Sequence, residues 1–416
     1  MKQKRIVIVG AGFGGLYTFR TLRKRLSDKA QYVIVNPENY FLFTPMLHEV
    51  ATGNVPAENI IEPLRKALRI RCTELLLGCV RSVDRERGVV RTATEDIPYD
   101  YLVLAPGSET NFFGNQNAMQ KSYTLKSLND AYRLKNRLLE LMETATRMRS
   151  KDRKALLSFV IVGGGPTGVE LAAEMAELFE KTFKRFYDEA IVKDVSITLV
   201  DQNKELITMF SPSMRKRAAA SLTRAGIRLR LETGVQDVQR DQVLLKNGER
   251  IPSNTTIWVA GVKPATIDFN GPIERDRSGR CLVHPNLKLN GSHNIFVIGD
   301  AAACLQDQRP LPALAQVAVK QGTYVANAIA DEIEGKEPSP FYYKHAGSLL
   351  SLGRWNAIAE IAGIKFSGHL AWWIWRTIYL SKFISWNKKI EVAVDWTRGI
   401  FTPRDISRVD PTTKKC

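Results

Sequence analysis

The chain has 416 residues, enough for two or three domains with cores of their own, and its 44% hydrophobic content is ordinary for a soluble protein. No apolar run reaches the roughly 18 residues needed to cross a bilayer, and the N-terminal apolar run breaks at once into glycines, unlike a secretory signal. Scattered cysteines without a C-x-x-C pair argue against a disulfide framework, and the five histidines show no metal-ligand spacing. We therefore expect an intracellular protein without a bound metal. The formal net charge of +17 suggests an anionic partner, either nucleic acid or a membrane surface.

A strand predicted at Ile6–Val9 runs directly into a first glycine fingerprint, which a helix-compatible segment follows. The glycines of this fingerprint are Gly10, Gly12, Gly14 and Gly15. In a dinucleotide-binding unit such glycines make a tight turn, let the backbone approach a pyrophosphate and let helix pack on strand, while the helix N-terminus offers free N–H groups. The next predicted strand, Tyr32–Val35, ends at Asn36, which bonds a ribose hydroxyl more weakly than the usual acid. The alternative is an ordinary glycine turn before a packing helix.

A second fingerprint of the same type follows the predicted strand Phe159–Val162. Its residues are Gly163, Gly165, Pro166, Thr167 and Gly168. Proline suits the first helical position, where a missing N–H costs little. The following strand, Ser196–Val200, leads to Asp201, whose charge favours a free 2′-hydroxyl and repels a 2′-phosphate. The second unit is therefore expected to prefer NADH to NADPH.

Two later strands join the first unit. Tyr101–Ala105 is followed by a turn at Gly107, and Ile295–Ile298 ends at Gly299-Asp300, where two-dinucleotide flavoproteins hold the flavin ribityl chain. Asp300 as a simple helix cap is the alternative. We predict an α/β fold with two Rossmann-like domains, the second inserted into the first, and a helical C-terminal segment. The expected boundaries are 1–120 with 265–335 for the FAD domain, 121–264 for the NADH domain and 336–416 for a membrane-associated region.

The C-terminal segment 369–389 is rich in tryptophan and lysine. On one continuous helix its aromatic side chains form a stripe, namely Trp372, Trp375, Tyr379, Phe383 and Trp386. Cations flank the stripe at Arg376, Lys382, Lys388 and Lys389. Trp and Tyr favour the headgroup layer and lysine favours anionic lipid, so we expect an amphipathic helix lying on a membrane. A helix buried in its own domain or in a dimer interface is the alternative. Nucleic-acid binding is disfavoured, because an indole stripe among Ile and Leu would bury its rings.

These motifs together resemble the type II NADH dehydrogenases, the single-subunit NADH:quinone oxidoreductases. The segments that carry the resemblance are Gly10–Gly15, Phe43–Leu47, Gly163–Glu170, Trp258–Gly261, Gly299–Asp300 and Ala315–Gly322. The resemblance implies a flavoprotein with non-covalent FAD that passes electrons from NADH to the quinone pool without pumping protons. It further implies peripheral attachment to the cytoplasmic face of the cell membrane through C-terminal helices, often as a homodimer.

The resemblance also implies roles for individual residues. Expected at FAD are Gly10, Gly12, Gly14, Gly15, Asn36, Thr44, Pro45, Val80, Ala105, Gly107, Asp300, Ala301 and Gln316. Expected at NADH are Gly163, Gly165, Pro166, Thr167, Gly168, Glu170, Asp201 and Gly261. Three residues are expected to be catalytic: Glu170 near the nicotinamide–flavin contact, Gln316 with its amide toward a quinone carbonyl, and Gln321 beside it.

Some of these assignments have alternatives. Glu170 as an acid in a first helical turn would be explained by the helix dipole alone, and Thr44 and Pro45 would suit a core. Lys320 stands where the family commonly has a glutamine, which affects the expected quinone preference.

Three other functions fit parts of the pattern. A sulfide:quinone oxidoreductase shares the architecture but needs paired cysteines near the flavin, and only Cys304 lies near a cofactor motif. A ferredoxin or disulfide reductase has no use for the tail, or lacks its dithiol. A redox-sensing protein would bind both cofactors without turnover.

Overall fold

The computed structural model describes residues 3–68 and 73–408. The chain forms two compact units, each built from separate stretches of sequence. Unit 1 comprises Met1–Leu42, Ile61–Glu109 and Val262–His345, and unit 2 comprises Phe43–Ile60, Thr110–Gly261 and Ala346–Cys416. The insertion of one nucleotide-type unit into the other is thus visible in the chain path, while the predicted three-part boundaries stay a prediction.

Unit 1 carries the following helices and strands: β1 (Lys4–Val9), α1 (Phe13–Leu26), β2 (Ala30–Asn36), β3 (Tyr40–Leu42), β4 (Ile61–Pro63), α3 (Leu64–Leu68), β5 (Thr73–Leu77), β6 (Ser82–Asp84), β7 (Val89–Arg91), β8 (Asp96–Pro98), β9 (Tyr101–Leu104), β10 (Ser108–Thr110), β19 (Val262–Pro264), β20 (Asp268–Phe269), β21 (Cys281–Leu282), β22 (Ile295–Val297), β23 (Ala302–Ala303), β24 (Leu305–Gln306), β25 (Arg309–Pro310) and α11 (Ala315–Ile333). The strands predicted at the first fingerprint, at Tyr32–Val35, at Tyr101–Ala105 and before Asp300 are confirmed as β1, β2, β9 and β22.

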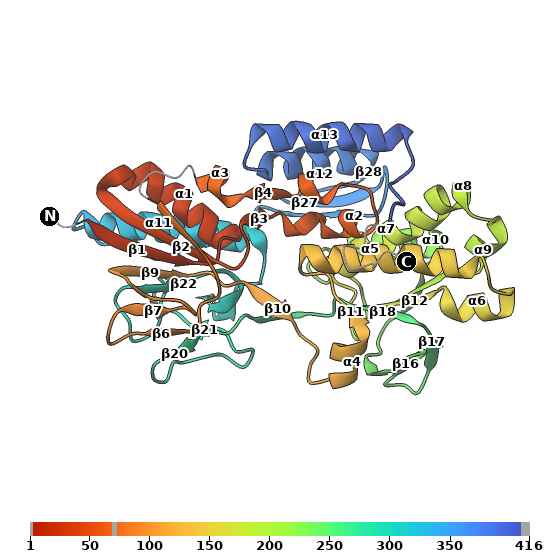
Figure 1. The fold of residues 1–416 in the computed structure, drawn as a ribbon, viewed down its shortest axis with the longest axis horizontal. Helices are drawn as coiled ribbons and strands as arrows, with labels where there is room; N and C mark the ends of the chain where they lie inside the picture. The colour runs from red at the N-terminus through yellow and green to blue at the C-terminus, as the bar shows by residue number, and fades with distance from the viewer. Residues whose placement is uncertain (1–2, 69–72, 409–416) are drawn as a thin grey trace. The chain divides into compact units, whose positions relative to one another are not determined.

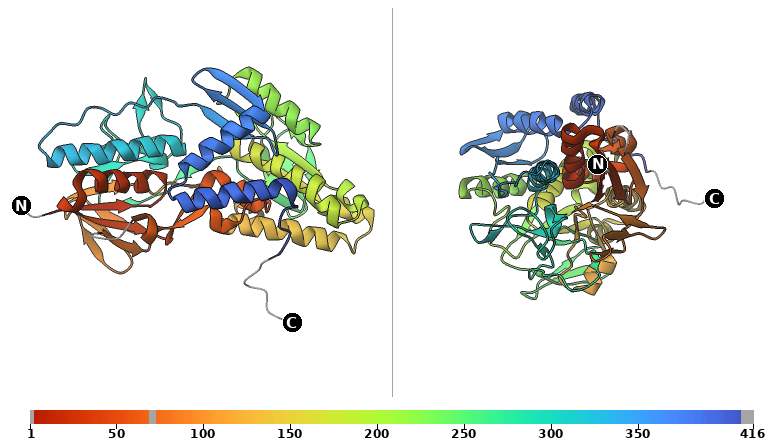
Figure 2. Two further views of the ribbon diagram at one scale, coloured as in Figure 1. Left: turned by 90° about the horizontal axis from the view of Figure 1, so that it is seen from above. Right: turned by 90° about the vertical axis from the view of Figure 1, so that its left-hand side faces the viewer.

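The centre of unit 1 is a parallel sheet whose strand order, among the described residues, is β22-β9-β1-β2-β5. Its strands are near-continuous apolar runs because both faces are covered. Helices α1 and α11 lie side by side on one face (Figures 1 and 2). The other face packs against the antiparallel β6-β7-β8 strands, where Val7 and Val33 share a core with Val83 and Val90.

The contact between α1 and α11 requires glycine. A Cβ at Gly322 would collide with the carbonyl oxygen of Gly14 and would lie 2.9 Å from Thr18 Oγ1. The two helices therefore approach more closely than side chains allow, which fixes α11 against the helix that begins at the fingerprint.

Unit 2 carries these elements: α2 (Leu47–Ala51), α4 (Gln116–Lys121), β11 (Ser122–Tyr123), α5 (Leu128–Ala145), α6 (Ser150–Leu156), β12 (Ser158–Val162), α7 (Pro166–Glu177), α8 (Lys184–Phe186), α9 (Glu189–Lys193), β13 (Ser196–Val200), α10 (Pro212–Arg224), β14 (Arg228–Arg230), β15 (Val235–Val238), β16 (Gln242–Leu245), β17 (Arg250–Pro252), β18 (Thr255–Trp258), β26 (Ser348–Ser351), β27 (Ala357–Ile361), β28 (Ile364–Gly368), α12 (His369–Lys382) and α13 (Trp386–Phe401).

The sheet of unit 2 repeats the plan of unit 1. Its parallel strands run in the order β11-β18-β12-β13-β14, with α7 following β12 as α1 follows β1. The antiparallel β15-β16-β17 strands pack on it through Val160, Val162 and Val243. Two such units confirm the predicted α/β class with two Rossmann-like sheets.

The C-terminal part of unit 2 is an antiparallel β26-β27-β28 sheet followed by two helices, with α12 lying across the sheet (Figure 1). The single helix predicted over 369–389 is wrong. Helix α12 ends at Lys382, Phe383 is extended, and Ser385 starts α13 by accepting a hydrogen bond from the Lys388 N–H at 3.3 Å. A serine N-cap offers the chain an alternative to continuing the first helix.

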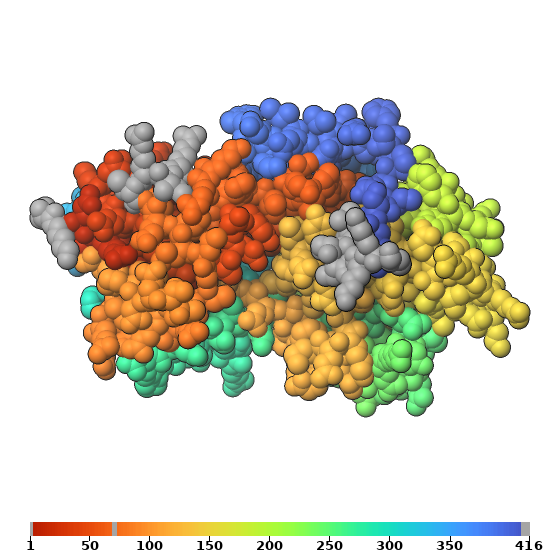
Figure 3. Space-filling model, viewed as in Figure 1, coloured from red at the N-terminus to blue at the C-terminus, as the bar shows by residue number. Residues whose placement is uncertain are grey.

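Three residues of the predicted aromatic stripe face the protein rather than lipid, whereas Trp386, also predicted in the stripe, is exposed. Trp372, Trp375 and Phe383 are only 4%, 2% and 6% exposed, so for them the buried alternative holds. The exposed apolar side chains of α12 and α13 are Trp386 together with five residues outside the stripe, namely Leu370, Trp373, Ile390, Val394 and Phe401. The two helices form a continuous area of the molecular surface, drawn in blue in Figure 3.

Within residues 3–68 and 73–408, no helix is long and apolar enough to pass through a lipid bilayer.

Candidate functional site: two dinucleotide loops and a buried acidic cluster

The first glycine loop is shaped to receive a pyrophosphate. Gly10 has φ +89°, and its N–H donates to Val35 O at 2.8 Å. A Cβ at Gly15 would collide with the Gly10 carbonyl oxygen, whereas a Cβ at Gly12 would meet nothing within 4 Å. Helix α1 begins at Phe13 with no side-chain cap and no acid in its first turn. Its free N–H groups therefore face open space beside Gly12, as FAD binding requires.

Asn36 holds this loop. Its side-chain Oδ1 accepts a hydrogen bond from the Ala11 N–H at 2.8 Å, and its Nδ2 donates to Glu38 O at 2.7 Å. Both ends of the amide are therefore engaged by main chain. Asn36 lies at the predicted place but acts on the loop itself.

The remaining predicted FAD residues of unit 1 gather at one edge of its sheet. Val80, Ala105, Gly107 and Ala301 follow the carboxyl ends of β5, β9 and β22, the edge at which β1 also ends. Asp300 Oδ2 accepts a hydrogen bond from Ser108 Oγ at 2.5 Å, so its side chain binds across the sheet edge rather than capping a helix. Ligands bind outside the carboxyl ends of parallel strands, so this placement fits FAD.

Thr44 and Pro45 lie in unit 2, in the short 3₁₀ helix Thr44–Met46. Phe43, just before them, is 2% exposed and stacks on Phe383 with ring centroids 4.5 Å apart. The predicted place of Thr44 and Pro45 beside FAD stays a prediction.

The second glycine loop has the same shape as the first. Gly163 has φ +117°, and a Cβ at Gly168 would collide with the Gly163 carbonyl oxygen. Pro166 occupies the first position of α7, as predicted, and Gly165 precedes it without a side-chain cap. A Cβ at Gly165 would meet nothing within 4 Å. The loop thus fits a second dinucleotide, with Thr167 in the exposed first turn.

Asp201 does for this loop what Asn36 does for the first. Its Oδ2 accepts a hydrogen bond from the Gly164 N–H at 2.5 Å and its Oδ1 accepts from the Asn203 N–H at 2.7 Å. Asp201 lies at the end of β13, as predicted, and its discrimination against a 2′-phosphate stays a prediction. Gly261, also predicted here, follows β18 with φ +156°, and its carbonyl accepts from the Asn111 N–H.

The two glutamines of α11 have different surroundings. Gln321 is 1% exposed, and its Oε1 accepts a hydrogen bond from the Gly299 N–H at 2.7 Å, which fixes the turn that presents Asp300. Gln316 lies in the first turn of α11, as predicted, and is partly exposed, with Nε2 3.5 Å from His345 Nδ1. Lys320 is exposed. Contact of Gln316 and Gln321 with a quinone stays a prediction.

Glu170 is buried inside unit 2. It is the fifth residue of α7 and lies beyond the first turn, so the helix-dipole explanation for this acid does not apply. Its Oε1 accepts a hydrogen bond from the Ser351 N–H at 3.2 Å, and its Oε2 lies 3.7 Å from His48 Nδ1. Burial raises the pKa of Glu170 well above its usual range, and Glu49 and Glu174 raise it further.

His48 and Glu49, which the sequence analysis missed, complete this cluster from helix α2. Burial lowers the pKa of His48 to about 3, and Arg404 lowers it further, so the imidazole is neutral at pH 7. Burial raises the pKa of Glu49 to about 8, with a contribution from the charge of Glu174. Glu49 Oε2 accepts from Trp396 Nε1 at 2.8 Å and from Asn54 Nδ2 at 3.1 Å.

Glu174, one helical turn after Glu170, forms an ion pair with Arg404 at 2.7 Å, and both side chains are over nine-tenths buried. The sequence held a signal for the burial of these acids, because Glu170 and Glu174 are four residues apart and so lie on one face of a mostly apolar helix. Glu177, three residues on, lies 3.4 Å from the same guanidinium.

Metal-ligand clusters are absent from residues 3–68 and 73–408. Cys79, Cys281 and Cys304 are free thiols, and Cys72 and Cys416 lie outside the described residues.

The sequence matches two known domain families. Residues 4–322 match the pyridine nucleotide-disulphide oxidoreductases and residues 345–405 match the NDH2 C-terminal domain. The chain is 34% identical to a type II NADH:quinone oxidoreductase of Mycobacterium tuberculosis, over 97% of this chain and 89% of the relative. It is 30% identical to a probable NADH dehydrogenase of Dictyostelium discoideum, over 98% of this chain and 92% of the relative.

Solved structures show the same fold. An NDH2 from Plasmodium falciparum, solved in complex with NADH, superposes with a TM-score of 0.91 at 21% identity and covers 98% of this chain and 100% of its own. A sulfide:quinone oxidoreductase from Aquifex aeolicus superposes with a TM-score of 0.73 at 20% identity, over 93% of this chain and 92% of that one. With both nucleotide loops, the NDH2-type C-terminal domain and the full-length sequence match, the chain belongs to the type II NADH dehydrogenase family.

Proposed function

We propose that this protein oxidises NADH and passes the two electrons through bound FAD to a membrane quinone, without pumping protons. The observation that carries the proposal is the pair of glycine loops, each heading its own parallel sheet and each opening a helix N-terminus to an anion. Relatives that match nearly the whole chain bear the names of NADH:quinone oxidoreductases. FAD, when bound, accepts a hydride from NADH and returns both electrons to an acceptor.

The residues divide between the two nucleotides. Unit 1 holds FAD through the loop at Gly10–Gly15, and Gln321 fixes the Gly299 turn so that Asp300 faces the same sheet edge. Unit 2 holds NADH through the loop at Gly163–Gly168, with Asp201 disfavouring NADPH. Ser108 donates a hydrogen bond to Asp300 and so holds its carboxylate at this edge for FAD.

Glu170 is assigned to the nicotinamide–flavin contact, where it helps to position or relay protons, and the glutamines serve the acceptor side of the reaction. A quinone takes up two protons with its two electrons, and burial raises the pKa of the Glu170 carboxyl group well above its usual range, which favours its holding a proton. Gln316, partly exposed at the start of α11, presents its amide to the quinone carbonyl. Gln321 is assigned the positioning role that its bond to Gly299 supports.

Helices α12 and α13 attach the protein to the cytoplasmic face of the cell membrane. Their exposed apolar residues, among them Trp386 at 76% and Phe401 at 81%, suit the interfacial layer, and Lys388 and Lys389 start α13 beside them. A homodimer is part of the same proposal, and light scattering of the detergent-solubilised protein measures it.

The decisive experiment is anaerobic. We expect the purified protein to be yellow, NADH to bleach the flavin absorbance within seconds, NADPH to bleach it far more slowly, and a quinone to restore it. Sulfide, tested in parallel, is expected to leave the colour unchanged. Bleaching by sulfide but not by NADH would replace the proposal with sulfide oxidation, and a reduced flavin that quinone fails to reoxidise would remove the acceptor.

A further inference from the structure

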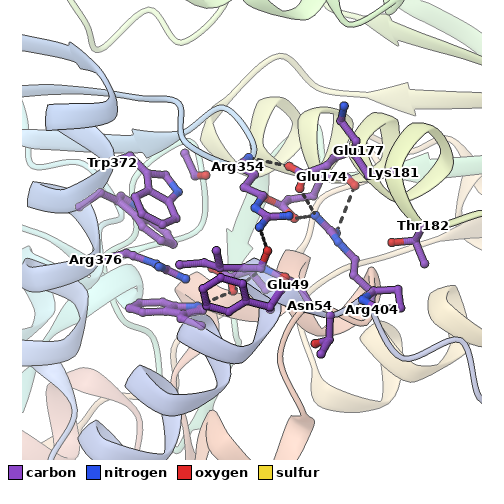
Figure 4. Close-up of a pocket in the computed structure, with 18 of the residues that line it drawn as sticks. Glu49, Asn54, Glu174, Glu177, Lys181, Thr182, Arg354, Trp372, Arg376 and Arg404 are labelled. Carbon is purple, nitrogen blue, oxygen red and sulfur yellow. Dashed lines mark hydrogen bonds and ion pairs between the residues drawn. The ribbon is translucent and has the colours of Figure 1, made fainter.

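A small pocket of unit 2 has no part in the proposed electron transfer. It lies where α7 meets α12, α13 and the chain that follows them, and its volume is about 60 Å³. Figure 4 shows it as a mostly polar hollow into which charged side chains converge. Five Lys or Arg and three Glu side chains line it together with three tryptophans.

Arg376 reaches into this pocket between two indole rings. Its guanidinium carbon lies 3.9 Å from the centre of the Trp372 ring and 4.7 Å from that of Trp396, and the residue is only 8% exposed. Its Nε is buried without a hydrogen-bond partner. The charges of Glu49 and Glu174 reach Arg376, but neither carboxyl group forms an ion pair with it among the described residues. Figure 4 shows the group directed toward the middle of the pocket.

The three glutamates of the pocket are engaged elsewhere. Glu174 pairs with Arg404 at 2.7 Å, and Glu177 accepts from the Arg354 N–H at 2.5 Å. Glu49 accepts from Trp396 and carries a proton for much of the time at pH 7, since its pKa is raised to about 8. Arg376 is thus a guanidinium held by stacking on two indoles, and its Nε donor has no hydrogen-bond partner.

A buried guanidinium with no acid in direct contact is costly, so a site of this kind favours an anion. Pockets that enclose whole small molecules have volumes of roughly 300–1,000 Å³, far above the space available here. The occupant is therefore a compact anionic group whose remaining atoms stay outside. A planar guanidinium is well suited to the paired oxygens of a phosphate.

The residues at the wall of the pocket indicate the chemistry of the ligand beyond its anionic group. Ile400 and Phe401 line it, and Phe401 is 81% exposed, at the end of the helix that also exposes Trp386, Ile390 and Val394. A molecule that enters here has apolar surface immediately outside the polar hollow. That arrangement matches a phospholipid, with its phosphate inside and its acyl chains along α13.

We propose that the Arg376 pocket is a binding site for the phosphate group of an anionic membrane phospholipid. The site gives the protein a specific lipid contact in addition to general attraction between lysines and a charged surface.

The test uses the full-length, FAD-loaded protein and three soluble probes. Dihexanoyl-phosphatidylglycerol carries phosphate and chains, inorganic phosphate carries only the anion, and dihexanoylglycerol carries only the chains. Native mass spectrometry counts bound probe, and tryptophan fluorescence follows binding because two indoles flank the site. We expect saturable binding of one phosphatidylglycerol, at concentrations at least tenfold below those at which inorganic phosphate binds, and no binding of dihexanoylglycerol.

Two substitutions separate the pocket from surface charge. Arg376→Gln is expected to weaken phosphatidylglycerol binding at least tenfold, whereas Arg398→Gln, which removes the same charge from an exposed position on α13, is expected to leave it unchanged. Arg376→Lys keeps the charge without the planar fork and is expected to bind with intermediate affinity. FAD content and the unfolding midpoint report whether each variant is folded, and the comparison of probes on the unsubstituted protein depends on no variant.

Three results would overturn the proposal. Equal binding of phosphatidylglycerol by folded Arg376→Gln would show that the site lies elsewhere. Equal affinity for inorganic phosphate would make free phosphate, and not lipid, the ligand. Binding of dihexanoylglycerol as tight as that of the phospholipid would show an apolar contact alone.

Discussion

Arg404 and Glu174 form a buried ion pair that ties the end of the chain to the helix of the second glycine loop. Arg404 Nη2 lies 2.7 Å from Glu174 Oε2, and Nη1 donates to the Glu174 carbonyl oxygen at 3.3 Å. Burial lowers the pKa of Arg404, but the charges of Glu174 and Glu177 raise it, and the net shift is upward. The C-terminal segment is therefore a structural part of unit 2 as well as a candidate membrane contact.

Removing one partner of this pair should strongly destabilise the protein. Arg404→Gln leaves Glu174 buried without its cation, and we expect a loss of about 3–5 kcal/mol in the free energy of unfolding, measured by urea denaturation. Arg398→Gln, on the exposed surface, should change it by less than about 0.5 kcal/mol. The double variant Glu174→Gln/Arg404→Gln is expected to recover part of the loss, and a full loss in the double variant would contradict this account.

The two glutamines of α11 should give opposite phenotypes. Gln321→Leu removes the acceptor of the partly buried Gly299 N–H, so we expect a stability loss of about 1–3 kcal/mol and weaker FAD retention. Gln316→Leu is expected to retain FAD and to be reduced normally by NADH while its reoxidation by quinone slows. FAD content and stopped-flow absorbance measure both, and the reverse pattern would exchange the two roles.

Local sequence patterns predicted both nucleotide loops because strand, glycine turn and helix are each encoded within a few residues. The starts of α7 at Pro166 and of α11 near Gln316 follow from such signals. The buried cluster at His48 and Glu49 was missed, because nothing in the short segment around them indicates that charged side chains become enclosed. Their burial comes from α7 and α13, which are distant in sequence.

The C-terminal segment 369–389 likewise shows that the sequence did not predict which side chains become buried. Helical periodicity identified the stripe that contains Trp372 and Trp375 but could not say which surface it meets. The helix ends at Lys382 and a new one starts at the capping residue Ser385. The sequence-based prediction followed the helical periodicity and gave this capping residue no weight. Arg376, expected to serve as a surface cation, is instead enclosed by two indoles.

Glu49 should make stability fall as the pH rises. Burial raises its pKa from 4.5 to about 8, so between these values the folded protein keeps a proton that the unfolded chain has lost. The stabilisation is complete below pH 4.5 and disappears as the pH passes 8. Glu49→Gln does not titrate, so its unfolding free energy relative to the parent should increase across this window by more than about 1.4 kcal/mol, the value of one pKa unit. Denaturation at pH 5 and pH 8 measures this, and a constant difference would contradict it.

Asp201 should control the choice between NADH and NADPH. Asp201→Asn removes the negative charge and puts an amide opposite the N–H groups of Gly164 and Asn203, one of which then loses its acceptor. We expect the ratio of kcat/KM for NADPH to that for NADH to rise about tenfold, mainly through a lower KM for NADPH, because the repulsion of its 2′-phosphate is removed. Asn36→Ala serves as the matched change at the other loop and should weaken FAD retention without altering this ratio. An unchanged ratio in Asp201→Asn would remove the electrostatic argument.

Membrane attachment should depend on the exposed residues of α13. Trp386→Ser with Phe401→Ser removes two large apolar side chains that are 76% and 81% exposed, and we expect at least a tenfold weaker partition into phosphatidylglycerol vesicles in a flotation assay. Phe186→Ser removes a side chain that is 54% exposed on α8 and should leave partition unchanged. Equal partition of all three proteins would place the membrane contact elsewhere. Point changes are preferable to deletion from residue 369, which would also remove Arg404.

The hydrogen bonds from the glycine loops to Asn36 and Asp201 affect any attempt to re-engineer this protein for another coenzyme. In each unit, the side chain that hydrogen-bonds the glycine loop, Asn36 or Asp201, also lies where the ribose of the adenosine is expected to bind. Replacing that side chain therefore alters the conformation of the loop as well as the choice of nucleotide. A redesign for NADPH must therefore supply a new hydrogen-bond acceptor for the Gly164 N–H before it adds a cation for the 2′-phosphate.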